Sequence, residues 1–466
     1  MSDDILYMSA CELVGHYRDQ TLSPVDVTRA TLERISAIDG KTNAFIVVDE
    51  ESALNDARQS EERWRTGKPL GPVDGVPTSI KDLVLAKGWP TLFGSRTTDP
   101  DQPWELDAPC VARLRENGAV IFGKTTTPEF GWKGVTDSGV SGITRNPWNL
   151  DMTPGGSSGG AGAAVAAGMC HLAIGTDGGG SIRIPSGFSG IFGLKPSFGR
   201  VPAWPMGRFG TLGHVGPMTR TVEDAALMLT VISQPDHRDW TALPYEPREY
   251  RDGLDQGLEG LRVAYSPNLG YANVDAEIAE IFASAVDNFK SLGAQVETAH
   301  PGFDDPRAAF RTLWWAGAAN GLSNLTEDQM NLVEPDFAEI VEEGRRIPLL
   351  DYIAADHQRA VLGELMMEFH REYDLLLTPS LAVAAFAAGT MSPRESDDPK
   401  WITWSPFTYP FNMTKQPAAS VPCGFTSEGL PVGLQIVGPP FADHLVLRAS
   451  YAYQRAYSFA DRRPSL

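Results

Sequence analysis

Two glycine-flanked serine sites within residues 153–202 constrain this chain more than any other feature. The first is GGSSGG at residues 155–160, and the second is GGGS at residues 178–181, with a run of small residues between them. Glycine is favoured where a backbone turns sharply or approaches another group closely. The pair therefore predicts backbone N–H groups and serine hydroxyls that converge on one small site. Each cluster alone is also typical of an ordinary tight turn, because glycine and serine dominate turns.

The hydrophobic pattern on either side of this stretch favours an α/β fold. Residues 108–124 have the pattern of a helix followed by a strand, and residues 261–297 that of strand, helix and strand. This alternation is typical of a sheet with helices packed against it. Ser23, followed by Pro24, and Thr221 are expected to be helix N-caps. We also expect strands at residues 76–84, 172–175, 373–378 and 431–437, and helices at 162–169 and 443–457.

The chain is expected to form a single domain over residues 1–466, because no linker, internal repeat or low-complexity run divides it. Within it we distinguish an N-terminal helical layer (1–70), a core (71–230) and a remainder (231–466). The remainder would supply the rest of the sheet, the pocket loops and the last helix. Residues 388–410 are the least regular part, and a loop of that length in a compact chain is usually functional or mobile.

Charge and hydropathy exclude several classes of function. The formal net charge is −20, whereas nucleic-acid binding needs a basic face. A polyanionic substrate is disfavoured for the same reason. No apolar run approaches the roughly 18 residues of a membrane-spanning helix, and the acidic N-terminus does not have the pattern of a signal peptide. We therefore expect a cytoplasmic protein with neither a nucleic-acid nor a membrane partner, and the sequence indicates no oligomeric state.

The cysteines and histidines indicate no metal or redox chemistry. The four cysteines are scattered without a CxxC spacing, and the eight histidines form no HExxH or HxH cluster. So few cysteines in a chain of this length do not form a disulfide framework. We expect no metal and no cofactor.

Three common glycine-rich motifs fit the chain poorly. Neither glycine cluster ends in the Lys-Ser/Thr pair of a phosphate-binding P-loop, and the residues before Gly155 form a loop where a dinucleotide fingerprint needs a strand. GSSGG at residues 156–160 formally matches the GxSxG nucleophile elbow, with Ser158 at its centre. The elbow also needs a strand immediately before the serine and a histidine partner after it, and neither is recognisable.

A fourth arrangement combines both serine sites with a lysine. Lys81 lies in an apolar segment, where it is either an edge residue that reaches water or a desolvated amine with a lowered pKa. A neutral amine can remove the proton that keeps a serine hydroxyl a weak nucleophile. The glycines before Ser181 would supply backbone N–H donors for an oxyanion, each worth about 3 kcal/mol in the transition state.

These motifs resemble the amidase signature family. The resemblance covers GGSSGG, the small-residue segment and GTDGGGSIRIPSGFSGIFGLKPSFGRVP, and extends over residues 74–226. QPAASVP from residue 416 and GLPVGLQIVG from residue 429 are similar to the C-terminal part of the family. Several long motifs in the same order make the resemblance specific. It implies a single large α/β domain with a mixed, twisted central sheet and helices on both faces.

The resemblance also implies a role for each site residue. Ser181 would be the acyl-forming nucleophile, Ser157 a relay serine on a cis peptide bond, and Lys81 the terminal base. The remaining positions implied by the family are the oxyanion-hole residues Gly178, Gly179, Gly180 and Ser181, and the supporting residues Ser158, Asp177 and Arg183.

The chain departs from the family pattern at a few positions. Gly178 stands where the family often has a larger residue, so we expect a looser loop there. Ile184-Pro185 and TPEF at residues 127–130 replace the IRQP and MDEF that are typical of glutamyl-tRNA amidotransferases. These differences favour a stand-alone small-molecule hydrolase over an ammonia-releasing amidotransferase component that needs a partner enzyme.

Aromatic and apolar residues indicate the kind of substrate. A pocket lined by such residues suits an apolar or aromatic amide. We therefore expect hydrolysis of small neutral amides such as aryl acylamides, with esters and carbamates (urethanes) as further substrates. The residues expected to line the pocket are Phe130, Trp132, Trp204, Met206 and Phe209, and further candidates are Trp314, Trp315, Trp401 and Trp404.

Overall fold

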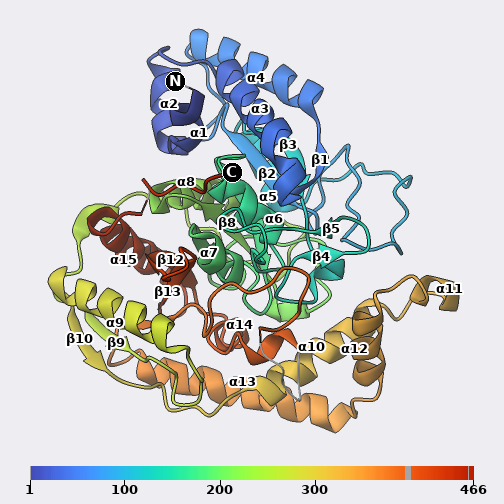
Figure 1. The fold of residues 1–466 in the computed structure, drawn as a ribbon, viewed down its shortest axis with the longest axis vertical. Coiled ribbons are helices and arrows are strands. Elements are labelled where there is room, and N and C mark those ends of the chain that lie inside the picture. The colour runs from blue at the N-terminus through green and yellow to red at the C-terminus, as the bar shows by residue number, and fades with distance from the viewer. Residues whose placement is uncertain (1, 394–399, 460) are drawn as a thin grey trace.

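A mixed β-sheet runs through the centre of the computed structural model, which describes residues 2–393, 400–459 and 461–466 (Figure 1). Within these residues the sheet has eleven strands. Strands β3, β2 and β6 are mutually parallel, as are β11, β9 and β10, and the other neighbours are antiparallel. From edge to edge the order is β1 (Phe45–Val48), β3 (Val120–Thr125), β2 (Pro77–Lys81), β6 (Leu172–Asp177), β8 (His214–Thr219), β7 (Phe192–Lys195), β12 (Ala418–Phe425), β13 (Pro431–Val437), β11 (Leu375–Pro379), β9 (Arg262–Tyr265) and β10 (Gln295–Thr298).

Helices cover both faces of the sheet. Alternate residues of a strand point to opposite faces, and in β6 Leu172 and Ile174 belong to one hydrophobic core while Ala173 belongs to another. The helices are α1 (Ser2–Tyr7), α2 (Ala10–Arg18), α3 (Pro24–Thr42), α4 (Glu50–Arg65), α5 (Pro109–Glu116), α6 (Gly159–Ala166), α7 (Arg183–Ser189), α8 (Val222–Ile232), α9 (Ala276–Ser291), α10 (Arg307–Gly321), α11 (Glu327–Met330), α12 (Pro335–Arg345), α13 (Leu349–Phe369), α14 (Pro410–Met413) and α15 (Asp443–Ala456).

Three hydrophobic cores hold these layers together. Helices α5, α8, α9 and α15 pack on one face, and α3, α4 and α6 share a core on the other face. A third core joins α10, α12 and α13 to the aromatic residues of the 400–413 segment. Figure 1 shows α10, α12 and α13 at the opposite end of the molecule from α2, α3 and α4. The expected α/β domain, with a mixed sheet between helices, is confirmed.

Most of the expected elements are present, with shifted bounds. Ser23 caps α3 by accepting a hydrogen bond from the Val25 N–H, and Thr221 caps α8 through the Asp224 N–H. The strand expected at 76–84 is wrong at its end, because the chain turns after Lys81 and the Val84 N–H donates to the Lys81 carbonyl. The helix expected at 162–169 begins earlier, at Gly159, and ends at Ala166.

The segment expected to be irregular is only partly described by the structure. In the irregular 388–410 segment, residues 394–399 lie outside the described residues, and Trp401–Thr403 form a short 3₁₀ helix with a buried Trp401.

Of the described helices, none combines the length and apolar character needed to cross a bilayer.

Candidate active site

The edge of the sheet where β2 and β6 end forms the floor of the candidate site. The two strands are parallel neighbours, with Ile80 beside Ile174, and the carboxyl ends of parallel strands meet at the same edge. Lys81 is the last residue of β2, and Thr176 and Asp177 end β6. The topology therefore brings the lysine next to the residues that precede the glycine run.

Lys81 is fully buried and surrounded by three hydroxyl groups. Its Nζ lies 2.7 Å from Ser157 Oγ, 2.8 Å from Ser158 Oγ and 2.9 Å from Thr176 Oγ1. Burial lowers the pKa of the Lys81 amine well below its usual value, and the charge of Asp177 only partly opposes this effect. A charged ammonium would donate to all three hydroxyls, whereas a neutral amine would donate to two of them and accept from the third.

The orientation of Ser158 indicates where the lone pair of that amine points. Ser158 Oγ donates to the Thr176 carbonyl at 3.2 Å, so toward Lys81 it acts as an acceptor. If the amine also donates to Thr176 Oγ1, its lone pair is left for the hydroxyl proton of Ser157. In that arrangement the lone pair faces Ser157 Oγ, 2.7 Å away.

Ser157 and Ser158 immediately precede α6, and the peptide bond between Gly156 and Ser157 is cis. Glycine is required at position 156, because a Cβ there would lie 2.5 Å from the Val135 backbone. The backbone of this loop also contacts the second serine site, since the Ser158 N–H donates to the Ser181 carbonyl at 3.2 Å. The two glycine clusters expected to converge do lie side by side.

Ser181 lies in the loop between β6 and α7, and together with Ser157 it lines one cavity. In the described part of the chain, the N–H groups of Gly178, Gly179 and Ser181 donate to no protein acceptor. Gly180 differs from the expectation for an oxyanion-hole residue, because its N–H donates to Asp177 Oδ1 at 2.8 Å. Its φ of +134° is a conformation that L side chains rarely adopt, so Gly180 shapes the loop and donates no hydrogen bond into the cavity.

Asp177 and Arg183 form a buried ion pair beneath this loop. Arg183 Nε and Nη2 donate to the two carboxylate oxygens at 3.0 and 2.9 Å. Burial alone would raise the pKa of Asp177, but the Arg183 guanidinium, the Lys195 charge and the Asn412 hydrogen bond together outweigh it and hold that pKa well below its usual value. Three distant groups complete the network around Arg183: the Thr408 carbonyl, the Asn412 side chain and the Gln435 side chain. Asp177 also lines the cavity, whereas Arg183 lies behind it and does not, and the supporting role of the pair stays a prediction.

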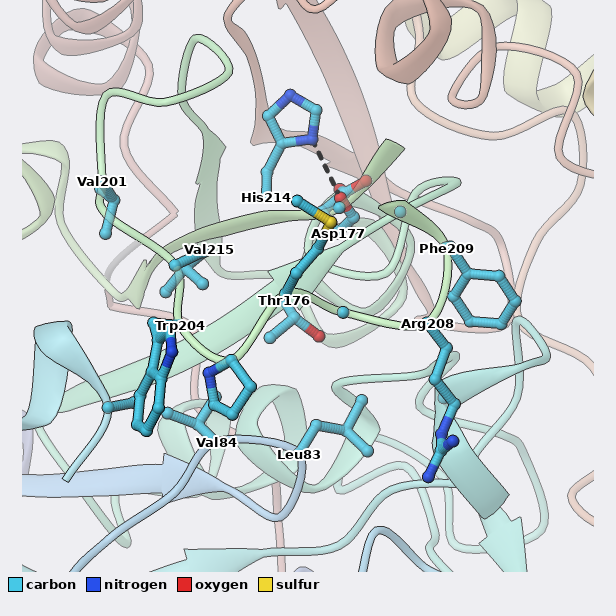
Figure 2. Close-up of a pocket in the computed structure, with 18 of the residues that line it drawn as sticks. Leu83, Val84, Thr176, Asp177, Val201, Trp204, Arg208, Phe209, His214 and Val215 are labelled. Atoms are coloured by element: carbon cyan, nitrogen blue, oxygen red, sulfur yellow. Dashed lines mark hydrogen bonds between the residues drawn. The ribbon is translucent and has the colours of Figure 1, made fainter. Parts of the chain in front are cut away.

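A cavity of about 370 Å³ opens over Ser157 and Ser181. Figure 2 shows Trp204 and Val84 on one side of Thr176, and Arg208 and Phe209 on the other. Of the five side chains expected to line the pocket, Phe130, Trp204, Met206 and Phe209 do so, as does Trp314.

Trp132 does not line this cavity, and its expectation is corrected. The ring is fully buried and stacks on Phe337 at 5.5 Å between centroids. Trp315, Trp401 and Trp404 are likewise core residues that do not line the cavity. Trp314 and Trp315 are consecutive in α10 and therefore face different sides of the helix, so that Trp314 alone reaches the cavity.

A neighbouring aromatic ring occupies the space beside Gly178. A Cβ at this position would lie 2.9 Å from Trp314 Cζ3, and the Trp314 ring stacks on Phe209 with centroids 3.5 Å apart. The expectation of a looser loop stays a prediction. The indole occupies the space that a larger residue at 178 would take.

Sequence reasoning missed three residues of the site. Thr176 contacts Lys81. A hydroxyl residue directly before Asp177 is the sequence signal that could have identified it. His214 Nδ1 faces the carbonyls of Leu212 and Asp177, so it carries the ring proton, and Nε2 has no protein partner among the described residues. Burial lowers the pKa of His214 well below its usual value. Arg208 lines the cavity as well, and no local motif marks it.

Comparison with known proteins gives the family. The sequence profile described as Amidase matches residues 26–447. The chain belongs to the amidase family. This amidase is 39% identical to an acylamidase of Rhodococcus erythropolis, over 98% of this chain and 97% of that protein. It is also 35% identical to a glutamyl-tRNA(Gln) amidotransferase component of Moorella thermoacetica, over 99% of both chains.

Solved structures of relatives have the same fold. A bacterial aryl acylamidase of the amidase signature enzymes superposes with a TM-score of 0.91 at 31% identity, over 98% of this amidase and 99% of that chain. The resemblance found from the motifs is confirmed, and the chain is a hydrolase of amide C–N bonds.

Among the described residues no group of three or more His, Cys, Asp or Glu side chains is placed to hold a metal ion.

Proposed function

We propose that this amidase hydrolyses small acyl amides, anilides among them, through an acyl intermediate on Ser181. The observation that carries the proposal is the buried Lys81 amine, 2.7 Å from Ser157 Oγ at the floor of a cavity that Ser181 also lines. The full-length similarity to an acylamidase supports the substrate class.

In the proposed first step, the neutral amine of Lys81 takes the hydroxyl proton of Ser157, and Ser157 takes that of Ser181. Ser181 Oγ then bonds to the carbonyl carbon, and the carbonyl oxygen becomes an oxyanion. The free N–H groups of Gly178, Gly179 and Ser181 would stabilise that charge, at about 3 kcal/mol for each well-placed donor. Gly180 takes no part, because its N–H is bonded to Asp177.

The leaving amine would then receive the proton through Ser157 as the C–N bond breaks. A water molecule would hydrolyse the acyl-Ser181 ester by the reverse sequence of proton transfers. Esters and carbamates contain the same carbonyl electrophile, so we propose them as further substrates. A cytoplasmic location remains our prediction from the sequence.

The test uses the purified chain alone with a 4-nitroanilide of a short acid. We expect release of 4-nitroaniline, and loss of at least about 10³-fold in kcat/KM for Ser181→Ala. A serine-directed fluorophosphonate should add one mass increment to the wild type and none to Ser181→Ala. The matched control is Ser189→Ala, which removes a buried hydroxyl outside the cavity.

Two outcomes would contradict the proposal. If Ser158→Ala abolishes turnover while Ser181→Ala is mild, the nucleophile-elbow mechanism is correct. If the chain is active only with a partner protein, it acts as the ammonia-releasing component of an amidotransferase, the alternative that the similarity to the Moorella thermoacetica protein raises.

A further inference from the structure

Arg208 is a cationic group on the wall of the otherwise largely apolar cavity. It lies in the segment between β7 and β8, and it lines the same cavity as Ser157 and Ser181. Figure 2 shows Arg208 beside Phe209, across Thr176 from Trp204. The hydrolytic steps proposed above make no use of this guanidinium.

Helix α10 holds Arg208 in a defined position. A Cβ at Gly321 would lie 2.9 Å from Arg208 Cβ, and a Cβ at Gly317 would lie 3.0 Å from the Arg208 carbonyl. These two glycines, one turn apart, leave room for the arginine stem against the helix. The guanidinium lies 3.9 Å from the ring centroid of Phe130, and its Nη1 donates to the Gly321 carbonyl.

No ion pair compensates the charge of Arg208 within the part of the chain that the structure describes. Among the described residues no carboxylate lies within 4 Å of its guanidinium nitrogens. Glu129, the acidic group that acts on it electrostatically, is bonded instead to the Ser95 hydroxyl and the Glu334 N–H. An arginine stays protonated in proteins, and a half-buried charge without a partner is costly.

The other acidic side chains of the cavity are already engaged. Asp177 is paired with Arg183, and Asp239 accepts hydrogen bonds from the Ala203 N–H and from Thr241. A guanidinium stacked on a ring keeps its in-plane N–H groups for acceptors, in the fork that matches a carboxylate. The position, rigidity and charge of Arg208 therefore all fit an anionic ligand group.

We propose that Arg208 is a subsite for a carboxylate on the substrate, so that this amidase favours amides that carry one carboxylate. The inference rests on the proposed amide hydrolysis and adds a substrate class to it. One guanidinium in a largely apolar cavity suits a single negative charge better than a polyanion. The net charge of −20 disfavours a polyanion as well, because it would repel one.

Two matched substrate pairs test the subsite. Succinyl 4-nitroanilide against butyryl 4-nitroanilide places the carboxylate on the acyl side, and 4-acetamidobenzoate against acetanilide places it on the amine side. We expect the wild type to favour the carboxylate member of one pair by about 10- to 100-fold in kcat/KM. Arg208→Met, which retains the apolar stem, should bring that ratio close to one.

Control variants separate the charge from general damage. Arg208→Lys keeps the charge without the fork and should retain part of the preference. Arg58→Met removes an exposed arginine on α4 and should leave the ratio unchanged. If Arg208→Met does not fold, as judged by thermal unfolding, the wild-type ratio and the lysine variant decide the question.

The proposal is overturned if the wild type shows no preference within either pair, or if Arg208→Met keeps the preference. If no anilide is hydrolysed at all, the proposed function fails, and calorimetry with the same anilides still tests the subsite. Tighter binding of the carboxylate member to the wild type, lost in Arg208→Met, would support it, whereas equal binding would overturn it.

Discussion

Lys81 is the residue whose protonation state the proposed chemistry depends on most. Its amine is buried among three hydroxyl groups, and the nearby ion pair of Asp177 with Arg183 has little net charge. Desolvation therefore dominates and lowers the pKa of the amine, which favours its neutral form at a cost in stability. The lowered pKa leads to two predictions, one for the pH dependence of kcat/KM and one for the pH dependence of the free energy of unfolding.

The activity should depend on pH through this amine. The neutral form is the base, so kcat/KM should rise as pH rises through the lowered pKa of Lys81 and then reach a plateau. Lys81→Met, which keeps the length of the side chain, should lose about 10²- to 10⁴-fold. Lys41→Met, at an exposed lysine, is the control. Full activity of Lys81→Met would exclude Lys81 as the base.

The stability should change with pH in the opposite sense from that of an ion-paired lysine. The folded pKa lies below the unfolded value, so between the two the unfolded chain binds more protons. The free energy of unfolding therefore rises with pH, by at most about 1.4 kcal/mol per unit. In urea titrations at pH 7 and 9, the wild type should gain stability relative to Lys81→Met. An equal difference at both pH values would show that Lys81 is charged when buried.

At the residue scale, the sequence motifs led to Lys81, Ser157 and Ser181, because each lies in a segment with its own local signature. Arg208 has no such signature. Its position depends on two glycines of α10, about a hundred residues later in the chain, and on the ring of Phe130. Contacts of this kind between distant segments cannot be read from local pattern.

At the scale of elements, the glycine loop and α10 are fitted to each other. The ring of Trp314 fills the space beside Gly178, stacks on Phe209 and donates its Nε1–H to the Trp132 carbonyl at 3.2 Å. Since the ring is held on three sides, it cannot easily move away from a new methyl group at 178. The loop and the helix should therefore respond to mutation as one unit.

Gly178→Ala tests this fit. Overpacking of a rigid site typically costs about 1–3 kcal/mol, and we expect a lower melting temperature and reduced turnover of the anilide. Adding Trp314→Leu should recover part of both losses, a coupling that independent sites would not show. Gly15→Ala is the control, because nothing lies within 4 Å of a Cβ there. Additive effects in the double variant would contradict the fit.

The elements differ in how far their sequence indicated them. Strands β6 and β13 are mostly apolar, with Thr176 and Asp177 at the end of β6 and Gln435 within β13. Ser23 and Thr221 mark helix starts, so these elements were predictable. Helices α10, α12 and α13 were not assigned. In α13, Leu349, Leu350 and Val361 are exposed, so its apolar residues do not form the single buried stripe that reveals an amphipathic helix.

At the scale of the whole molecule, the loop that carries Ser181 is supported by the far end of the chain. Arg183, just after Ser181, is bonded to Asn412 on α14 and to Gln435 on β13. Asn412 also donates to Asp177 Oδ1 at 2.8 Å. The sheet order makes this possible, because β12 pairs with β7 and β13 pairs with β12 in the centre of the sheet, although both are late in sequence.

Asn412→Leu should weaken this support. It leaves buried partners of an ion pair unsatisfied, at a cost of about 1–3 kcal/mol for each group. We expect a lower urea midpoint and a lower kcat with a smaller change in KM, because the loop that carries Ser181 loses its anchor. Asn320→Leu, at an exposed position of α10, is the control. An unchanged kcat would show that the C-terminal anchor does not affect the site.

The link between Arg183 and Asn412 also bears on the order of events during synthesis. A ribosome delivers both serine sites long before the segment that anchors them, and Gln435 emerges later still. We expect a nascent chain that already contains Ser181 to be inactive until Asn412 and Gln435 have been synthesised and have bound Arg183. Hydrolytic activity should therefore begin only when translation is nearly finished.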